Sequence, residues 1–356
     1  MSRAKILVSH TDLARFLIAA LAAKGMRPDD AATVADVLVW ANLRGHDSHG
    51  VSRVPRYVEM MGAGDMDPTA RPIYELDLPA RFLLDGRRCM GPIAMMQAVA
   101  TATERAKAAG LCFGLVRRTT HTGAIGRYAQ WAAERGCVAV IAAAGVPLMA
   151  YHGARVRSLS TSPLAIAVPS GRHGAIVLDM ATSVAALGRL VQARTDTESI
   201  PQGWALAEDG TPTTDAKKAA IPLPLGGPKG SGLSLMFEFL TGVLSGAPAL
   251  APALGPERRR RHIQNTMLLV IDVAAFRPAA QFDADADGLI DIIKRLPLRD
   301  GFPEILLPGE RGNRTEAARR ASGIPIPSET WDALGRMAKA LAIDLPPVLP
   351  QSAPGA

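Results

Sequence analysis

The chain has few aromatic residues, few cysteines and no long uninterrupted apolar run. Phe, Trp and Tyr make up 4% of its 356 residues, so aliphatic side chains and methionine must build the core. The three cysteines, Cys89, Cys112 and Cys137, form no Cys-x-x-Cys pair, which argues against a zinc site and a disulfide framework. No segment offers the roughly 20 apolar residues of a membrane span, and residues 1–10 lack the apolar core of a secretion signal. We therefore expect a cytoplasmic protein that binds no metal and contacts no membrane.

Negative charge is in the minority, because 33 Asp and Glu residues stand against 40 Lys and Arg, which gives a net charge of +7. A basic balance suits nucleic-acid binding, but the one dense run, 258–261, lies in a Pro- and Gly-rich stretch without interleaved aromatics that could stack on bases. We interpret this run as a solvated loop and expect no nucleic-acid partner. A basic protein that binds anions or nucleic acid without catalysis remains the alternative from another class. In an enzyme, the same charge would favour an anionic substrate.

The hydrophobic pattern changes near residue 72. Before it, apolar residues recur at helical spacing, with Ser9 or Thr11 as a cap of the first helix and Pro28 in the first turn of the second. After it, strand-like runs alternate with helical stretches at irregular intervals, which favours a mixed sheet over a doubly wound parallel one. The expected helices are 12–23, 28–43, a short one that contains Tyr57, 93–109, 124–135, 184–193, 233–244, 284–295 and 328–342. The expected strands are 73–84, 111–118, 138–144, 164–169, 175–179, 267–273 and 305–307.

These patterns predict an α/β protein of two domains, in keeping with the chain's length. Residues 1–71 and 284–345 would form a discontinuous helical domain, because we expect the C-terminal helices to pack against the N-terminal ones. Residues 72–283 would form the mixed-sheet α/β domain. Residues 346–356 are rich in Pro, Ser and Gly and would form a disordered tail.

Two histidines, a carboxylate and a hydroxyl stand together in the turn after the second helix, as His46-Asp47-Ser48-His49. If a helix begins just after this run, Arg53 projects within about one turn of His49. Such a pair suits a small carboxylate substrate, because the guanidinium can hold the carboxylate while the imidazole donates or accepts a proton. A polar helix cap followed by a surface arginine would give the same pattern. The residues alone favour neither interpretation.

Two further segments could carry chemistry. His121 follows a predicted strand and precedes Gly123, at the kind of strand-to-helix junction where α/β proteins bind ligands, although a lone histidine there is more often structural. Segment 224–233 is rich in glycine, contains Lys229 and leads into an apolar helix, so its N–H groups could bind a phosphate. It is not a Walker loop, because the Gly-Lys-Ser/Thr order is absent. It is not a dinucleotide fingerprint either, because the third glycine is missing at the required spacing and no obvious strand precedes it.

Together, these segments resemble the malate/L-lactate dehydrogenase family that is unrelated to the common lactate and malate dehydrogenases. Its relatives act on sulfolactate, ureidoglycolate, diketogulonate and cyclic imino acids. The resemblance covers about residues 9–343. The matching motifs, in family order, are His46-Asp47-Ser48-His49-Gly50 with Arg53 and Tyr57, Thr120-His121-Thr122-Gly123, Ser162-Pro163-Leu164-Ala165, Asp179-Met180-Ala181-Thr182-Ser183, Pro201-x-Gly203-Trp204 with 209–215, Leu225-Gly226-Gly227-x-Lys229-Gly230, and Leu307-Pro308-Gly309-Glu310.

The resemblance implies a homodimer with a non-Rossmann cofactor domain and a nicotinamide cofactor, NAD or NADP. The implied reaction transfers a hydride between nicotinamide and C2 of a small 2-hydroxy or 2-oxo acid similar to malate or lactate. His121 would be the acid/base, His49 would orient or share the proton, and Ser48 and Arg53 would lie in the substrate pocket. The residues that would border the cofactor are Asp179, Met180, Ala181, Lys229, Gly309 and Glu310, with a further contact near Gly145.

Several choices stay open in the sequence. Thr120 stands where many family members have Asn, and 264–267 replaces a frequent Gly-His-Phe, so the substrate itself is not fixed. A reductase of cyclic 2-imino acids is the alternative within the same fold. The residues decide neither between NAD and NADP nor between His49 and His121 as the group that transfers the proton. A serine hydrolase that uses Ser48 is a further alternative, which the absence of a Gly-x-Ser-x-Gly elbow disfavours.

Overall fold

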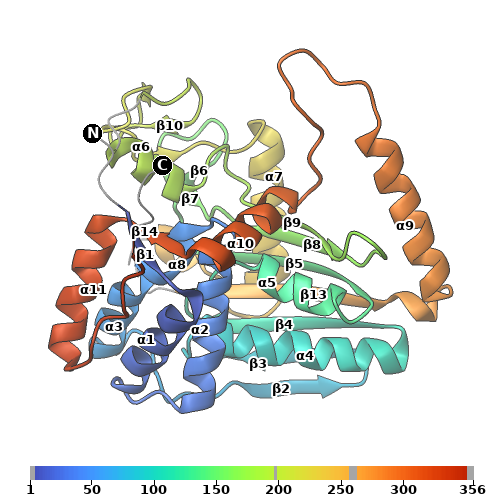
Figure 1. The fold of residues 1–356 in the computed structure, drawn as a ribbon, viewed down its shortest axis with the longest axis horizontal. Coiled ribbons are helices and arrows are strands. Elements are labelled where there is room, and N and C mark those ends of the chain that lie inside the picture. The colour runs from blue at the N-terminus through green and yellow to red at the C-terminus, as the bar shows by residue number, and fades with distance from the viewer. Residues whose placement is uncertain (1–4, 196–198, 256–262, 351–356) are drawn as a thin grey trace.

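A seven-stranded mixed sheet runs through the centre of the molecule (Figure 1), in the order β2–β3–β4–β13–β5–β8–β9. The computed structural model describes residues 5–195, 199–255 and 263–350. In this sheet β3 and β4 are parallel and all other neighbours are antiparallel. This arrangement confirms the predicted mixed-sheet, non-Rossmann α/β class. The strands are β2 (Ile73–Leu78), β3 (Arg81–Asp85), β4 (Leu111–Thr119), β5 (Cys137–Gly145), β8 (Leu164–Val168), β9 (Ile176–Met180) and β13 (Gln264–Asp272).

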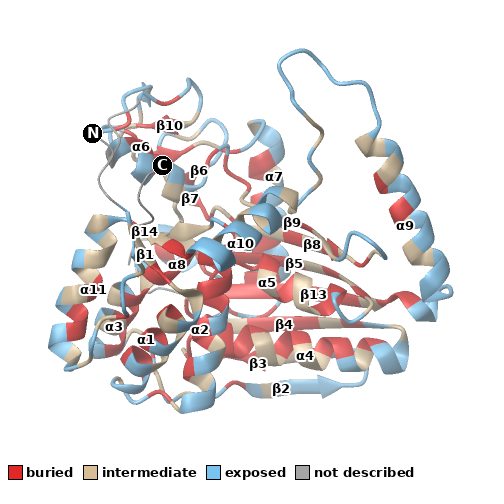
Figure 2. Ribbon diagram, viewed as in Figure 1, coloured by how far each residue is buried: buried red, intermediate tan, exposed pale blue. Residues whose placement is uncertain are grey.

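Helices cover both faces of the sheet. On one face lie α4 (Gly91–Ala109) and α5 (Gly126–Ala133), and alanines such as Ala139, Ala143 and Ala165 let the helices approach the strands closely. On the other face lies α7 (Pro228–Glu238), which continues into the π-helix η3 (Phe239–Val243). Phe237 of α7 packs there against Leu115 and Met267. Figure 2 shows the resulting buried layer through the strands and the inner helix faces.

The N-terminal helices pack outside α4 and α5. Ser9 caps α1 (His10–Ala22) by accepting the Asp12 N–H over 3.0 Å, as one of the two predicted caps. The next helix, α2 (Pro28–Leu43), begins at the predicted proline and buries most of its surface, because it lies between α1 and the helices on the sheet. Two 3₁₀ turns, η1 (Asp47–His49) and η2 (Val51–Arg53), lead into α3 (Val54–Gly62).

The C-terminal segments return to this helical layer in part. Strand β14 (Ile324–Ile326) pairs with β1 (Ile6–Val8), and α10 (Glu310–Ser322) and α11 (Ser328–Leu341) lie beside α2 and α3. In contrast, α9 (Ala279–Lys294) stands apart from the N-terminal helices in Figure 1, beyond the edge of the sheet. Residues 346–350, the start of the predicted disordered tail, are ordered, because Leu349 donates to Leu7 and Val348 bridges to Val8. The division of the chain at residues 71 and 284 stays a prediction.

Two predicted elements were wrong. The run 73–84 is not one strand, because the chain reverses between β2 and β3 to form an antiparallel hairpin. Residues 305–307 form no strand but a loop, and the helix α10 that follows them was not expected. No residue of α10 is fully buried, so its sequence lacks the apolar stripe by which helices are recognised.

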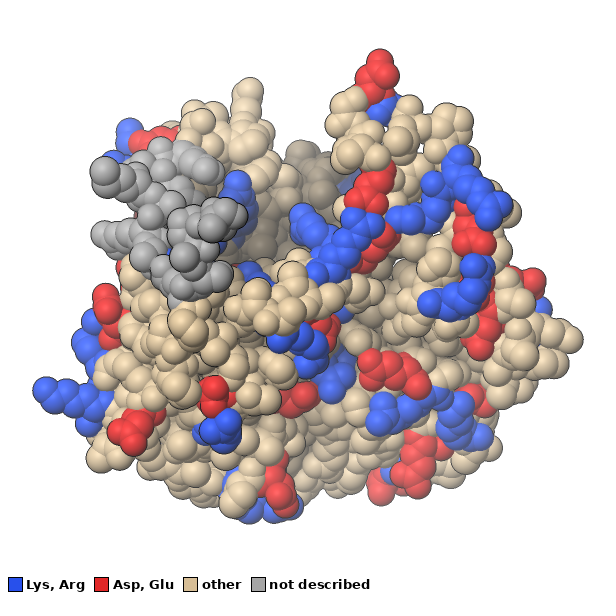
Figure 3. All heavy atoms as spheres, in the orientation of Figure 1, with Lys and Arg blue, Asp and Glu red and all other residues tan. Residues whose placement is uncertain are grey.

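Smaller elements complete the described part of the chain. They are β6 (Met149–Ala150), β7 (Arg157–Leu159), α6 (Leu187–Thr195), β10 (Ala205–Leu206), β11 (Pro212–Thr213), β12 (Ile221–Pro222), α8 (Leu250–Leu254) and η4 (Val273–Ala275). None of the described helices is long and apolar enough to cross a membrane. The basic run 258–261 lies outside the described residues. On the face in Figure 3, basic and acidic side chains are interspersed.

Candidate active site

The turn after α2 is fixed by the side chain of Asn42. Its amide oxygen accepts the Val51 N–H over 2.8 Å, and its amide nitrogen donates to Asp47 over 2.9 Å. Gly50 passes so close that a Cβ there would lie 2.1 Å from the Asn42 amide oxygen, which excludes any larger residue. Arg319 of α10 holds the Asp47 carboxylate through two nitrogens, at 2.6 and 3.1 Å. Asp47 therefore supports the turn instead of facing a substrate.

The remaining polar groups of the turn contact one another. The Ser48 hydroxyl lies 3.0 Å from His49 Nδ1, and Arg53 Nε donates to the Ser48 carbonyl over 2.5 Å. Burial, followed by the positive charges of Arg53 and His46, lowers the pKa of His49 to about 3. His49 is therefore a neutral imidazole at neutral pH.

His121 lies in the loop after β4, and three neighbours fix that loop. The Thr120 hydroxyl donates to the Cys89 carbonyl over 3.0 Å, and Gln264 of β13 accepts the Thr122 N–H over 2.9 Å. At the start of α4, a Cβ on Gly91 would lie 2.5 Å from the His121 carbonyl, so the helix end and the loop are in direct contact. Thr120 thus has a defined structural partner.

The turn and the loop bring their histidines together. The ring centroids of His49 and His121 are 5.4 Å apart. The Tyr57 hydroxyl of α3 lies 2.6 Å from His121 Nδ1, and the Gly123 N–H donates to the same nitrogen over 3.2 Å. The predicted catalytic and substrate-binding residues, Ser48, His49, Arg53 and His121, therefore form one cluster. No described group of three or more His, Cys, Asp or Glu residues is arranged to hold a metal ion.

The end of β9 lies beside the start of α5 and the start of α10. Asp179 accepts the Gly126 N–H over 2.9 Å, and burial raises the pKa of this carboxyl although His46 and Arg44 act to lower it. Gly309, at the start of α10, has φ +82°, and a Cβ there would lie 2.9 Å from the Val177 carbonyl of β9. Gly309 therefore lies against the same strand that carries Asp179, and both residues are expected to border the cofactor.

The side chain of Glu310 is fully engaged within the protein. Its carboxylate accepts hydrogen bonds from the Leu307 N–H, Lys294 and Arg314. Burial acts to raise the pKa of Glu310, but these donors outweigh it and lower the pKa to about 2. A ligand at this position would meet the backbone instead of the carboxylate.

The other cofactor candidates lie along two adjoining segments. Gly145 pairs with Gln264, whose amide also holds the His121 loop. Met180 ends β9, and Ala181 leads to Thr182, whose carbonyl accepts the Leu225 N–H over 2.8 Å. That bond ties the end of β9 to the glycine-rich segment with Lys229, which is exposed. No hydrogen bond among the described residues joins Lys229 to His121.

The glycine-rich segment is not the open cradle of N–H groups that its sequence indicated. The N–H groups of Gly227, Lys229, Gly230 and Ser231 all donate to carbonyls of the same segment. Gly226 and Gly227 have φ of +56° and +60°, which only glycine adopts readily. The charge that this segment can offer an anion is therefore the Lys229 ammonium, which pairs with no described acidic residue.

Three supporting residues of the site escaped sequence analysis. The Arg44 guanidinium donates to the Gly309 carbonyl over 3.0 Å and so joins the turn to the start of α10. Gly188 of α6 lies against Ser48, since a Cβ would stand 2.4 Å from the Ser48 Cβ. Gln264 holds the Thr122 N–H. No local pattern marks these residues, because each contact joins segments that are distant in the sequence.

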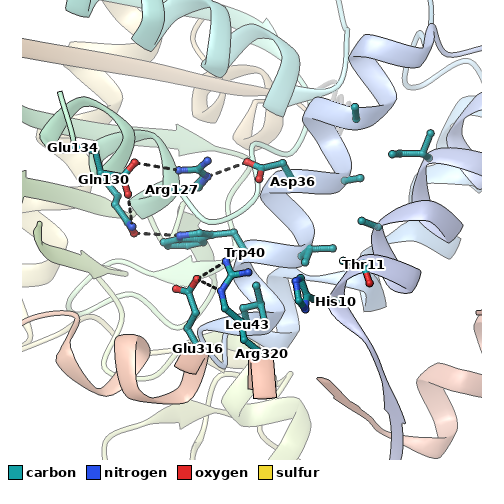
Figure 4. Close-up of a pocket in the computed structure, with 15 residues that line it drawn as sticks. His10, Thr11, Asp36, Trp40, Leu43, Arg127, Gln130, Glu134, Glu316 and Arg320 are labelled. Atoms are coloured by element: carbon teal, nitrogen blue, oxygen red, sulfur yellow. Dashed lines mark hydrogen bonds and ion pairs between the residues drawn. The ribbon is translucent and has the colours of Figure 1, made fainter. Parts of the chain in front are cut away.

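A cavity of about 370 Å³ lies between α1, α2, α5 and α10 (Figure 4), away from this cluster. Its charged groups are paired with one another: Arg127 lies 3.0 Å from Asp36, and Arg320 lies 2.7 Å from Glu316. Neither His49 nor His121 lines it. The chemistry of the candidate active site therefore does not depend on this cavity.

Comparisons with known proteins point to one family. Residues 8–335 match the family model described as malate/L-lactate dehydrogenase. The chain is 34% identical over 351 residues to the malate dehydrogenase of Pyrococcus horikoshii, and the alignment covers 95% of this chain and 96% of the relative. It is 31% identical over 334 residues to the L-sulfolactate dehydrogenase of Methanocaldococcus jannaschii, with 93% and 96% covered.

Solved structures give the same result. The crystal structure of malate dehydrogenase from Entamoeba histolytica has a TM-score of 0.91 at 27% identity, with 96% of this chain and 99% of that chain covered. The delta1-piperideine-2-carboxylate reductase from Pseudomonas syringae pvar. tomato has a TM-score of 0.80 at 27% identity, with 93% and 99% covered. The chain therefore belongs to the malate/L-lactate dehydrogenase family, as its motifs predicted.

Proposed function

We propose that this chain is an oxidoreductase that interconverts a small 2-oxo acid and the corresponding 2-hydroxy acid. The observation that carries the proposal is the cluster of His121, His49 and Arg53, in which an acid/base group lies beside a carboxylate-binding group. Among the described residues, no hydrogen bond or ion pair engages the terminal nitrogens of Arg53, since only its Nε donates, to Ser48. The guanidinium can therefore hold a substrate carboxylate through two parallel hydrogen bonds.

We assign the proton transfer to His121. During reduction, C2 of the oxo acid gains a hydride and its oxygen gains a proton, and a positioned acid typically accelerates such a step by about a hundredfold to ten-thousandfold. His49 is a poor proton donor, because its pKa of about 3 leaves it neutral. His49 and the Ser48 hydroxyl are better suited to orient the substrate by hydrogen bonds.

The residues around β9 fit a nicotinamide dinucleotide, NAD or NADP, which would supply the hydride when bound. The exposed Lys229 can meet a phosphate. Gly309 and Gly145 keep their backbones close to neighbouring segments, since a Cβ on either would lie 2.9 Å from the carbonyl of Val177 or of Ile263. Asp179 and Met180 end β9, against which Gly309 lies, Ala181 follows them, and Glu310 would contribute its backbone. Since no residue here marks the ribose 2′ position, the choice between the two dinucleotides falls to the assay.

A cyclic 2-imino acid is the second candidate substrate, supported by the similarity to a piperideine carboxylate reductase. The same residues would serve, with the proton delivered to the imine nitrogen instead of the carbonyl oxygen. The hydrolase alternative is weaker. Ser48 does contact His49, but an imidazole with a pKa of about 3 is too weak a base to activate a serine at neutral pH.

We further propose a cytoplasmic homodimer. The α7–η3 segment and α9 carry large apolar side chains that are exposed in the single chain, and contiguous exposed apolar surface often marks an interface. On the two segments these side chains are Leu233, Met236, Phe239, Leu240, Val243, Leu289 and Ile292. Light scattering coupled to gel filtration should give twice the 37.5 kDa of one chain. A mass of one chain at micromolar concentration would refute the dimer.

The proposed reaction is tested by oxidation of NADH and NADPH at 340 nm. The panel contains pyruvate, oxaloacetate, sulfopyruvate, 2-oxoglutarate and cyclic 2-imino acids. We expect turnover with at least one acid and a loss of at least a hundredfold in His121→Gln. The matched control His173→Gln, in the turn between β8 and β9 and 3.5 Å from Asp291 of α9, should keep full activity. Undiminished activity in His121→Gln would overturn the assignment, and no turnover by the folded protein on the whole panel would count against the proposed reaction.

A further inference from the structure

Two hydrogen bonds meet at one nitrogen of the His121 ring and restrict where its proton resides. The Tyr57 hydroxyl lies 2.6 Å from Nδ1, and the Gly123 N–H donates to Nδ1 over 3.2 Å. A backbone N–H can only donate, so Nδ1 presents a lone pair toward Gly123. In this geometry the neutral ring carries its proton on Nε2.

Tyr57 differs from Gly123 because a hydroxyl can both donate and accept. It donates to Nδ1 when that nitrogen carries no proton, and after rotation of its O–H it accepts from Nδ1–H when that nitrogen carries one. Tyr57 is 2% exposed on α3, so its hydroxyl is held beside the ring without competition from water. Burial also raises the pKa of Tyr57, so the hydroxyl keeps its proton throughout the working range.

We propose that Tyr57 is a positioning residue that stabilises the charged, proton-donating form of His121, in which Tyr57 accepts from Nδ1–H while Nε2–H faces the substrate. When Nε2 gives its proton to the substrate, the ring becomes neutral with its remaining proton on Nδ1, which Tyr57 still accepts. This inference rests on the proposed function, because it takes His121 as the acid/base. The hydroxyl can pair with Nδ1 whether or not that nitrogen carries a proton, whereas the Gly123 N–H can pair with it only when Nδ1 carries none. Tyr57 would therefore be needed for the charged, proton-donating form.

The groups around His121 make this role specific. Arg53 on η2 carries the positive charge of the cluster and disfavours a second cation, and His49 on η1 is neutral. From β13 comes the uncharged amide of Gln264, and α4 contributes backbone at Gly91. Further out lie His46, which acts on His49, and Asp179, which binds Gly126 at the start of α5. Of the Tyr57 hydroxyl and the Gly123 N–H, which both lie on Nδ1, it is the hydroxyl that can accept from an imidazolium.

The test uses Tyr57→Phe, with Tyr128→Phe as the matched control. Tyr128 is equally buried and donates to the Thr122 carbonyl, next to His121 but not on its ring. Tyr57→Phe removes the hydroxyl from Nδ1 while the Gly123 N–H stays there, which favours the ring without a proton on Nδ1. One net hydrogen bond corresponds to about one pKa unit, so the pKa of His121 should fall by about one unit.

The pKa is measured by ¹⁵N NMR of histidine side chains in the full-length protein without substrate, with His121→Gln to assign the signal. The pH midpoint of kcat/KM for reduction should move to lower pH by the same amount. Tyr128→Phe should leave both midpoints unchanged. An unchanged or raised pKa of His121 in Tyr57→Phe, or an equal fall in Tyr128→Phe, would overturn the inference. If the NMR shift appears while wild-type protein reduces no substrate, the hydrogen-bond role stands and the proposed function fails.

Discussion

Arg44 joins the end of α2 to the start of α10, and its replacement tests how much that link stabilises the fold. Its side chain is 3% exposed. The guanidinium donates to the Gly309 carbonyl over 3.0 Å and to Asn313, lies 3.4 Å from Glu316, and stands 5.1 Å above the Trp40 ring. Burial lowers the pKa of Arg44, whereas Glu316 acts to raise it.

Arg44→Met keeps the unbranched stem and removes the guanidinium. Hydrogen bonds from a charged donor contribute about 1.5 kcal/mol or more each, so the loss of the bonds to Gly309 and Asn313 should cost about 3 kcal/mol. Glu316 adds little to this cost, because Arg320 still donates to it at 3.0 and 2.7 Å. At about 2 cal/mol/K of unfolding entropy per residue, 3 kcal/mol lowers the melting temperature by about 4 °C.

The assay is equilibrium urea unfolding followed by circular dichroism. The matched control is Arg56→Met, at an ion pair with Glu59 in which both side chains are about two-thirds exposed, at 67% and 64%. Exposed pairs contribute little, so this control should lose less than about 1 kcal/mol. Cofactor binding should also weaken in Arg44→Met, since Gly309 loses its anchor. An exposed ion pair contributes at most about 1 kcal/mol. If the free energies of unfolding of Arg44→Met and Arg56→Met differ by less than that amount, the buried hydrogen bonds of Arg44 do not stabilise the fold as proposed.

Three further predictions concern pH and packing. Burial and the charge of Arg53 depress the pKa of His49 to about 3, below the value of about 6.5 in the unfolded chain. The contribution of His49 to the free energy of unfolding is therefore complete above about pH 6.5 and is lost as the pH falls toward 3. His49→Gln should flatten the pH dependence of the free energy of unfolding in that window, and an unchanged slope of this curve would contradict the prediction. Burial acts to raise the pKa of Glu310, but its hydrogen-bond donors lower it to about 2. Glu310→Gln should therefore flatten the pH dependence of the free energy of unfolding between about pH 4.5 and 2. A flattening confined to higher pH would refute this prediction. Gly188→Ala places a Cβ 2.4 Å from the Ser48 Cβ and should lower kcat/KM at least about tenfold. The control Gly288→Ala, whose Cβ would meet nothing within 4 Å, should leave kcat/KM unchanged. Equal activity of the two variants would show that the contact of Gly188 with Ser48 does not matter for the reaction.

Local chemistry in the sequence determined much of this protein. The Ser9 cap, the first-turn Pro28 and the apolar spacing behind them predicted α1 and α2, because caps and periodicity act within a few residues. The reactive side chains were also recognisable, since an imidazole beside a guanidinium is suggestive wherever it folds. The mixed sheet followed from strands that alternate irregularly with helices.

What only the tertiary structure decided are contacts between distant segments. Helix α10 has no fully buried residue, and its links to the rest of the fold are polar: Arg44 donates to Asn313 of the helix, and Arg319 of the helix donates to Asp47. Its sequence therefore carries no apolar periodicity that would predict it. Which nitrogen of His121 meets Tyr57 depends on how α3 packs against the loop after β4. The sequence identifies the side chains that can exchange a proton, but their relative positions depend on contacts between distant segments. The burial that lowers the pKa of His49 likewise arises only when the folded chain excludes water from around its ring.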